Sequence, residues 1–268
     1  MSLGEAIARL PYASAPFEPG HVWLAGAGPG GLGCLTLDVV AALGQADVVI
    51  YDALVDQDVL QVAVQAEHFF VGKRAGKPST PQEEINRLMI EHARAGRRVL
   101  RLKGGDPNTF GRGGEEALAL AKAGIPFRFL PGITSAVGAL AGAGIPVTLR
   151  GVNKAVILAT GHAAGTSDDL DWAALAKTGQ PLVIYMGMRN LDRIADALME
   201  GGLSGTTPAA ILMSATTTDE RVLTGTLSEI AEKARAEGFG APALIVVGEI
   251  VRMRETLRQL QQEGTLIP

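Results

Sequence analysis

RLKGGDPNTFGRGGEE, residues 101–116, is the stretch that decides the fold. Hydrophobic residues lead into a double glycine, an acid and a proline, and a helical pattern begins only after a glycine-flanked arginine. The glycines lack a Cβ atom and let the backbone approach a ligand closely. An ordinary surface connection of about 2–6 residues would not need so many of them. We therefore interpret the stretch as a strand that delivers a binding loop.

Length and composition predict a soluble, two-domain cytoplasmic protein. The 268 residues suffice for two domains with cores of their own. No apolar run approaches the roughly 20 residues of a membrane span, and residues 1–20 do not resemble a secretion signal. The lone Cys34 cannot form an internal disulfide. Its apolar neighbours predict a packing role.

The charge pattern favours a small anionic substrate. A net charge of −4 argues against a general nucleic-acid binder. Residues 68–114 nevertheless contain ten Lys and Arg against four Asp and Glu, which suits an anion, although a solvated helix face is the alternative. The four histidines lack a paired acid or cysteine at ligand spacing, so no metal site is expected. They are His21, His68, His92 and His162.

Strand and helix patterns alternate from residue 21 onward. Strands are predicted at 21–25, 47–51, 69–71, 99–102, 126–130, 155–159, 182–185, 209–213, 222–225 and 244–247. Helices are predicted near 34–44, 81–95, 115–123, 135–142, 171–177, 190–200, 226–237 and 252–262. This alternation predicts an α/β fold with mostly parallel sheets, whose ligand loops follow the strands.

Three segments are expected along the chain. Residues 1–20 show no sustained periodicity and are expected to form an extension that is flexible or packed on a partner. The proline-punctuated GIPVTLR stretch predicts a boundary between one domain at 21–148 and another at 149–268.

The first glycine loop offers a competing interpretation. Gly26, Gly28 and Gly31 match G-x-G-x-x-G after a strand, and Asp52 lies about where a ribose-binding acid would stand. Alone, this pattern indicates a flavin or nicotinamide dinucleotide. However, Pro29 would remove one N–H from a phosphate-binding turn.

Taken together, the loops resemble those of the tetrapyrrole methylase family, and within it the enzymes that methylate uroporphyrinogen III. The matching pieces include VWLAGAGPG, ADVVIYDALV, FVGKRAGKP, VLRLKGGDPNTFGRGGEE, PGITSA, TGH, YMGM and PALIVVGEIV, in the family's order. The resemblance implies two unequal α/β domains with S-adenosylmethionine in a cleft between them, no metal, and a homodimer. It further implies two methyl transfers, through precorrin-1 to precorrin-2, feeding cobalamin or sirohaem synthesis.

The resemblance also implies roles for individual residues. Asp52 matches the proposed proton acceptor and Lys73 the proposed donor, with Arg112 and Glu115 as rivals. Arg112, Arg150 and Lys73 are expected to bind substrate carboxylates. The expected cofactor contacts are Pro29, Gly104, Gly105, Asp106, Thr109, Thr134, Ser135, Met186, Ala215, Pro242, Ala243 and Leu244.

The chain departs from the family pattern at three places, one of which is the central loop, where Asn108 and Thr109 replace more apolar residues. The usual Gly-Asp-Pro after the first GPG is replaced by Gly30, Gly31 and Leu32, and Leu149 stands where a histidine is usual. Cofactor binding is therefore a firmer expectation than substrate identity. Another precorrin methylase, a dinucleotide-dependent oxidoreductase and a non-catalytic binder remain as alternatives.

Overall fold

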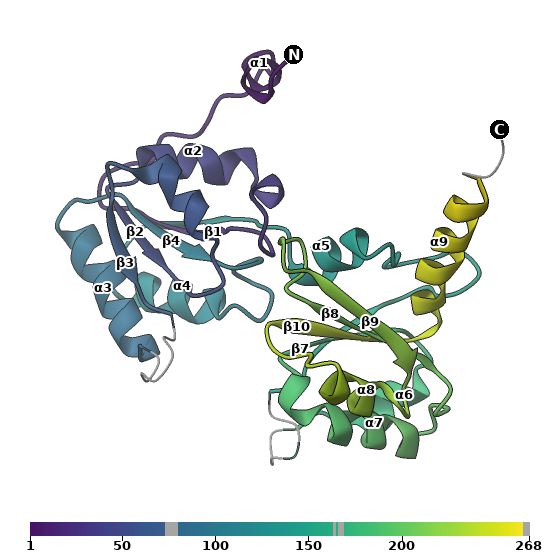
Figure 1. The fold of residues 1–268 in the computed structure, drawn as a ribbon. Coiled ribbons are helices and arrows are strands. Elements are labelled where there is room, and N and C mark those ends of the chain that lie inside the picture. The colour runs from purple at the N-terminus through teal and green to yellow at the C-terminus, as the bar shows by residue number, and fades with distance from the viewer. Residues whose placement is uncertain (73–79, 163–164, 166–168, 265–268) are drawn as a thin grey trace. The chain divides into compact units, whose positions relative to one another are not determined.

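A computed structural model describes residues 1–72, 80–162, 165 and 169–264 (Figure 1). The chain forms two compact units. The first comprises Met1–Ala27 and Leu35–Gly132, and the second comprises Gly28–Cys34 and the chain from Ile133 onward. The change of unit comes earlier than the boundary expected at residue 148. Helix α5 (Ser135–Gly142) accounts for the difference, because its alanine and leucine side chains pack in the core of the second unit.

The first unit is built on a fully parallel sheet in the order β3-β2-β4-β1-β5. Its strands are β1 (Val22–Gly26), β2 (Val48–Tyr51), β3 (Glu67–Phe70), β4 (Val99–Lys103) and β5 (Phe127–Leu130). The helices that pack against it are α2 (Leu37–Gln45), α3 (Gln82–Arg94) and α4 (Gly113–Lys122). Strand β4 lies at the centre and is buried along its whole length. Leu100 and Leu102 pack with α2, whereas Val99 packs with α3 and α4 on the opposite face.

The second unit contains a mixed sheet in the order β6-β7-β10-β8-β9. Its strands are β6 (Ile157–Thr160), β7 (Leu182–Tyr185), β8 (Pro208–Met213), β9 (Arg221–Thr226) and β10 (Ala243–Val247). Its other helices are α6 (Trp172–Lys177), α7 (Leu191–Glu200), α8 (Ile230–Ala236) and α9 (Arg252–Gly264). Among the described strands of this sheet, β6 and β7 pair in parallel, whereas β10 is antiparallel to β7 and β8, and β9 is antiparallel to β8. The expected parallel arrangement therefore describes the first sheet and not the second.

The first twenty residues contain more order than their composition predicts. Helix α1 (Leu3–Ala8) begins with a capping box, in which the Ser2 side chain accepts from the backbone of Glu5 and the Glu5 side chain accepts from the backbone of Ser2. Further along, the Phe17 ring stacks on Trp23 with centroids 4.1 Å apart. The sequence analysis thus missed the helix at residues 3–8, and Phe17 belongs to the core of the first unit.

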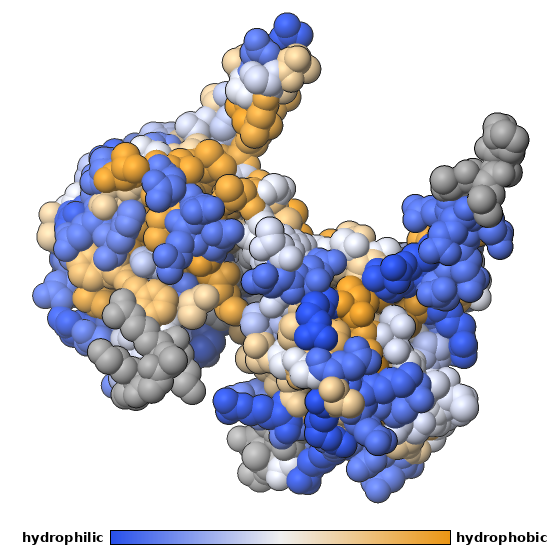
Figure 2. All heavy atoms as spheres, in the orientation of Figure 1, coloured by the Kyte–Doolittle hydropathy of each residue, from blue (hydrophilic) through white to orange (hydrophobic). Residues whose placement is uncertain are grey.

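Four short 3-10 helices complete the regular structure of the described chain. They are Leu32–Cys34, Gln57–Ala63, Met188–Asn190 and Glu249–Val251. Figure 2 shows polar side chains spread over the visible surface with apolar side chains among them. Among the described residues, no helix combines the length and apolar character that crossing a membrane requires.

Candidate functional site

The predicted loops of the first unit follow neighbouring strand ends. Because the strands are parallel, the carboxyl ends of β1, β2 and β4 lie at one edge of the sheet, with Gly26 beside Lys103 and Tyr51 beside Leu102. Asp52 comes directly after β2. This edge is where open α/β sheets bind their ligands.

Three glycines let the loops at this edge approach one another. A Cβ atom on Gly26 would clash with the carbonyl oxygen of Gly105 and the backbone of Gly132, and a Cβ atom on Gly132 would clash with the same oxygen. Backbone atoms cannot move aside as a flexible side chain can. Glycine is therefore required at Gly26 and Gly132 by packing within the loops.

Asp106 shapes the central loop. Its Oδ2 atom accepts from the Gly132 amide at 3.1 Å. Its Oδ1 atom accepts from the Asn108 amide at 2.9 Å and from Thr109 Oγ1 at 3.3 Å. Both carboxylate oxygens of Asp106, a predicted cofactor contact, thus accept hydrogen bonds within the protein. The Thr109 hydroxyl donates one of these bonds.

Asp52 is tied to the same loop. Its Oδ1 atom accepts from the amides of Leu54, at 3.1 Å, and Gly104, at 3.4 Å. A Cβ atom on Gly104 would clash with the Leu54 side chain. The side chain of Asp52 remains about a quarter exposed, at 26%. The structure thus holds this predicted proton acceptor beside the predicted cofactor loop.

Arg112 and Glu115 form a bidentate pair at the start of α4. Arg112 Nε and Nη2 donate to the two carboxylate oxygens of Glu115 at 2.9 and 2.6 Å. This hydrogen bonding raises the pKa of Arg112 and lowers the pKa of Glu115. Arg112 also adopts a left-handed backbone with φ 60°, as does Phe110 with φ 53°, a costly conformation that clusters at functional loops.

Five predicted cofactor contacts share one edge of the second sheet. They are Met186, Ala215, Pro242, Ala243 and Leu244. Because β10 is antiparallel, its amino end lies beside the carboxyl ends of β7 and β8, where Leu244 pairs with Tyr185 and Ala243 pairs with Met213. The family resemblance grouped these residues, and the antiparallel register of β10 places them at one edge.

Backbone strain concentrates at this edge. Met186, Ser214 and Thr216 have φ values of 53°, 48° and 66°, which non-glycine residues rarely adopt. The Met186 side chain is 51% exposed. A methionine that merely filled the core would be buried, so this exposure supports a contact with a ligand. The sequence analysis did not single out Ser214 or Thr216.

The start of α5 is fixed by a tyrosine of the second sheet. Tyr185 Oη lies 2.6 Å from Thr134 Oγ1 and accepts from the Ala136 amide at 3.0 Å. Thr134 is the N-cap residue and Ser135 begins the helix. The helix start that was predicted to hold a carboxylate therefore lies near Met186, which follows Tyr185 directly.

The first glycine loop packs within the second unit. A Cβ atom on Gly138 of α5 would clash with the Pro29 ring. The Gly31 amide donates to Thr216 Oγ1 at 3.2 Å. A phosphate-binding turn needs free N–H groups, but Pro29 has none and that of Gly31 is engaged. The geometry thus opposes the dinucleotide interpretation and places Pro29 near the start of α5.

The two remaining predicted substrate contacts differ in what can be said of them. Lys73 lies outside the described residues. Arg150 is exposed in a turn that Asn153 organises, because the Asn153 side chain accepts from the Leu149 amide and donates to the carbonyl groups of Val147 and Ala155. Sequence reasoning missed Asn153.

Among the described residues, most basic side chains between positions 68 and 114 have carboxylate partners. The described basic side chains in this region with carboxylate partners are Arg87, Arg97, Arg98, Arg101, Lys103 and Arg112. Of these, Arg101 and Lys103 are buried together with Glu116. Most of the described basic residues therefore do not add to a free cationic surface, and the three buried charges were missed by sequence reasoning.

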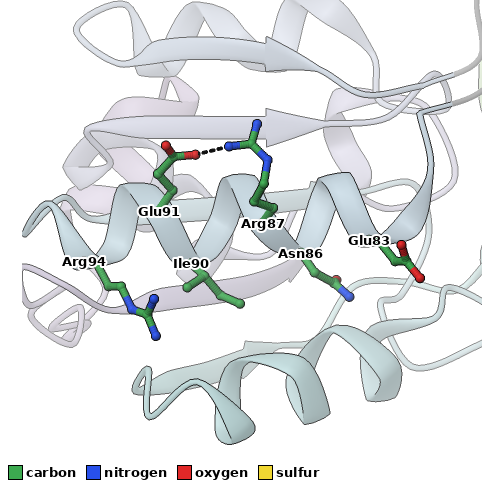
Figure 3. A pocket seen from close by; sticks show the side chains of 6 residues that line it. All are labelled: Glu83, Asn86, Arg87, Ile90, Glu91 and Arg94. Carbon is green, nitrogen blue, oxygen red and sulfur yellow. Dashed lines mark hydrogen bonds and ion pairs between the residues drawn. The ribbon is translucent and has the colours of Figure 1, made fainter.

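Two other features do not add to the site. His162 donates its amide to Thr160 Oγ1, and the described residues contain no group of three metal-ligand side chains. A hollow of about 650 Å³ lies along α3, where Figure 3 shows the Arg87–Glu91 pair. None of the predicted site residues lines it. Its lining residues are Glu83, Asn86, Arg87, Ile90, Glu91 and Arg94.

Comparison with known proteins gives consistent matches. A profile of the Tetrapyrrole (Corrin/Porphyrin) Methylases matches residues 21–231. A uroporphyrinogen-III C-methyltransferase of Sinorhizobium sp is 49% identical over 243 residues, which cover 90% of this chain and 87% of that protein. Siroheme synthase 2 of Aeromonas hydrophila is 50% identical over 252 residues, covering 92% of this chain and 53% of that protein. The chain thus spans about half the length of the siroheme synthases that it matches.

A solved structure shares the fold. The uroporphyrin-III C-methyl transferase of Thermus thermophilus, complexed with S-adenyl homocysteine, superimposes with a TM-score of 0.73 and 40% identity. The match covers 87% of this chain and 99% of that one.

Proposed function

The chain belongs to the tetrapyrrole (corrin/porphyrin) methylase family, and we propose that it methylates uroporphyrinogen III at carbon with S-adenosylmethionine, through precorrin-1 to precorrin-2. One observation carries the proposal: the Sinorhizobium uroporphyrinogen-III C-methyltransferase is 49% identical across 90% of the chain. The S-adenyl homocysteine complex of the Thermus enzyme supports adenosylmethionine as the methyl donor.

The second unit offers groups that suit this donor. The start of α5 at Ser135 favours a carboxylate. The exposed Met186 and the backbone around Ala215 and Leu244 provide an uncharged surface for a purine. Bound adenosylmethionine would supply an electrophilic methyl group. These residues would hold and orient it, since methyl transfer depends chiefly on alignment.

The first unit offers groups for the acceptor. Asp52 would take a proton from elsewhere on the tetrapyrrole once methylation has saturated the attacked carbon, acting as a general base. Arg112, Arg150 and Lys73 would bind the carboxylates of the tetrapyrrole, because arginine grips a carboxylate with two donors. Glu115 holds Arg112 in place through the bidentate pair. Gly104, Gly105 and Asp106 form the loop beside Asp52.

Assembly, location and pathway belong to the same proposal. We infer a cytoplasmic homodimer that feeds sirohaem or cobalamin synthesis. The siroheme synthase relatives support the former pathway. Light scattering of the purified protein would test the dimer.

The decisive experiment incubates the purified protein with methyl-labelled adenosylmethionine and freshly generated uroporphyrinogen III. We expect a product that carries two labelled methyl groups, together with binding of S-adenosylhomocysteine in calorimetry. Label transfer only to a later precorrin would assign the chain to another step of corrin assembly. Binding of NADH or flavin without binding of S-adenosylhomocysteine would contradict the proposal.

A further inference from the structure

Strand β4 carries two positive charges through the centre of the first sheet. Side chains alternate between the faces of a strand, so Arg101 and Lys103 share the face that α3 and α4 cover. Both are buried, at 3% and 4% exposure. A buried cation is costly unless it is paired and hydrogen-bonded. The partners of these two residues therefore show what the charges do.

Glu116 of α4 forms ion pairs with both cations. Its Oε1 atom accepts from Arg101 Nε, Lys103 Nζ and Gln82 Nε2, each at 3.1 Å. Arg101 Nη1 also donates to the carbonyl groups of Ile50 and Leu102 at 3.3 and 3.2 Å. Arg101 therefore donates to three acceptors through Nε and Nη1.

The remaining end of that guanidinium faces Asp52. Arg101 Nη2 lies 3.8 Å from Asp52 Oδ2, an ion pair longer than a hydrogen bond. The Oδ1 atom is occupied by the amides of Leu54 and Gly104. One carboxylate oxygen thus anchors two loops, and the other is turned toward a fixed positive charge.

Charge balance supports the same arrangement. Glu116 alone carries one negative charge against the two cations, and Asp52 supplies the second. A burial penalty lowers the pKa of Lys103, so the cluster is not cheap to keep. Replacing buried ion pairs with apolar residues is often neutral or stabilising. Stability therefore gives little reason for placing these charges in a central strand.

We propose that Arg101, clamped by Glu116, is a positioning residue that orients the Asp52 carboxylate for proton removal. This inference rests on the proposed function, in which Asp52 is the proton acceptor. Arg101 acts through Asp52 and does not itself touch the substrate.

The test compares the same change at two places on one chain segment. Arg101→Lys keeps the charge but loses the planar set of donors. The matched control is Arg98→Lys, because Arg98 pairs with Asp47 just before β4. We expect Arg101→Lys to lower kcat roughly 10- to 100-fold, as a small misplacement of a reacting group does, with little change in KM for adenosylmethionine. Arg98→Lys should keep the wild-type kcat. Equal kcat values in the two variants would overturn the proposal.

A double variant distinguishes a role of Arg101 in positioning Asp52 from a general disturbance of the structure. On an Asp52→Asn background, Arg101→Lys should cause no further loss of kcat, because the group that it orients is already gone. A further loss by the full factor seen in the single variant would contradict the proposal.

Amide resonances supply a readout that does not depend on turnover. In ¹⁵N-labelled protein, Arg101→Lys should shift the Leu54 and Gly104 amide signals, and Arg98→Lys should leave them unchanged. If Arg101→Lys does not fold, Asp52→Asn should shift the guanidinium signals of Arg101. Unshifted signals in either experiment would overturn the proposal that Arg101 orients Asp52. A wild-type protein that methylates no tetrapyrrole would instead refute the proposed function, and the resonances would still test the Arg101–Asp52 contact.

Discussion

The two ends of the first sheet use the same kinds of charged residue in opposite ways. At the amino ends of β2 and β4, Asp47 accepts from the Arg98 backbone amide, Nε and Nη2 at 2.9, 2.9 and 2.7 Å, with both side chains about one-third exposed. At the carboxyl end of β4, Lys103 is buried together with Arg101 and with Glu116 of α4. Ion pairs at the surface contribute little to stability and are easily lost. A buried cluster, in contrast, is costly unless every charge in it is paired. The costly arrangement stands where the loops lie.

The largest expected effect is a loss of activity caused by a change at the carboxyl end of the sheet. Asp52→Asn removes the proposed general base, and we expect kcat to fall about 10²- to 10⁴-fold. Binding of S-adenosylhomocysteine should not change. Asp47→Asn at the amino end is the matched control and should keep full activity in the labelled-methyl assay. Similar losses in both variants would remove the functional distinction between the two ends.

The next effect concerns stability. Glu116→Gln leaves Arg101 and Lys103 buried with only the more distant Asp52 carboxylate to balance them, and we expect a loss of about 3–5 kcal/mol in the free energy of unfolding. Urea denaturation followed by circular dichroism measures it. A loss no greater than that of Asp47→Asn would show that the buried cluster does not contribute more to stability than the exposed pair.

Glycines extend the comparison to the backbone. Gly132→Ala places a Cβ atom against the backbone of Gly26 and Gly105, and we expect a loss of about 1–3 kcal/mol. Gly44, near the amino end of β2, is exposed in α2 with open space around it. Gly44→Ala should therefore stabilise the protein by roughly 0.5–1 kcal/mol. Thermal denaturation should move the two midpoints in opposite directions.

The last predicted effect is a pH dependence of the stability that the Asp47–Arg98 pair contributes at the amino end. Hydrogen bonds from Arg98 lower the pKa of Asp47 from 3.8 to about 2. The folded state therefore holds fewer protons, so the stabilisation is present above about pH 4 and is lost as the pH falls toward 2. Solvent screening limits it to about 1 kcal/mol. Wild type and Asp47→Asn should converge in stability over this range, and parallel curves would contradict the assignment.

Local patterns predicted most of the secondary structure. All ten strands appear within a few residues of their expected positions, because glycine and proline punctuation marks their ends. Helix α1 was missed, although the spacing of Ser2 and Glu5 is a capping-box signal. The mixed order of the second sheet was also missed, since alternation of strands and helices does not reveal strand direction.

The sequence by itself determined the element order, the glycine-rich loops and the family resemblance, because these depend on neighbouring residues and motif spacing. It singled out Asp52, Arg112 and Glu115 but not Arg101 or Glu116. Only the tertiary structure brought together β4, α4 and the end of β2, and so revealed a buried charge cluster behind Asp52. The physical reason is that the cost of burying a charge depends on partners far away in the chain, which local patterns do not specify.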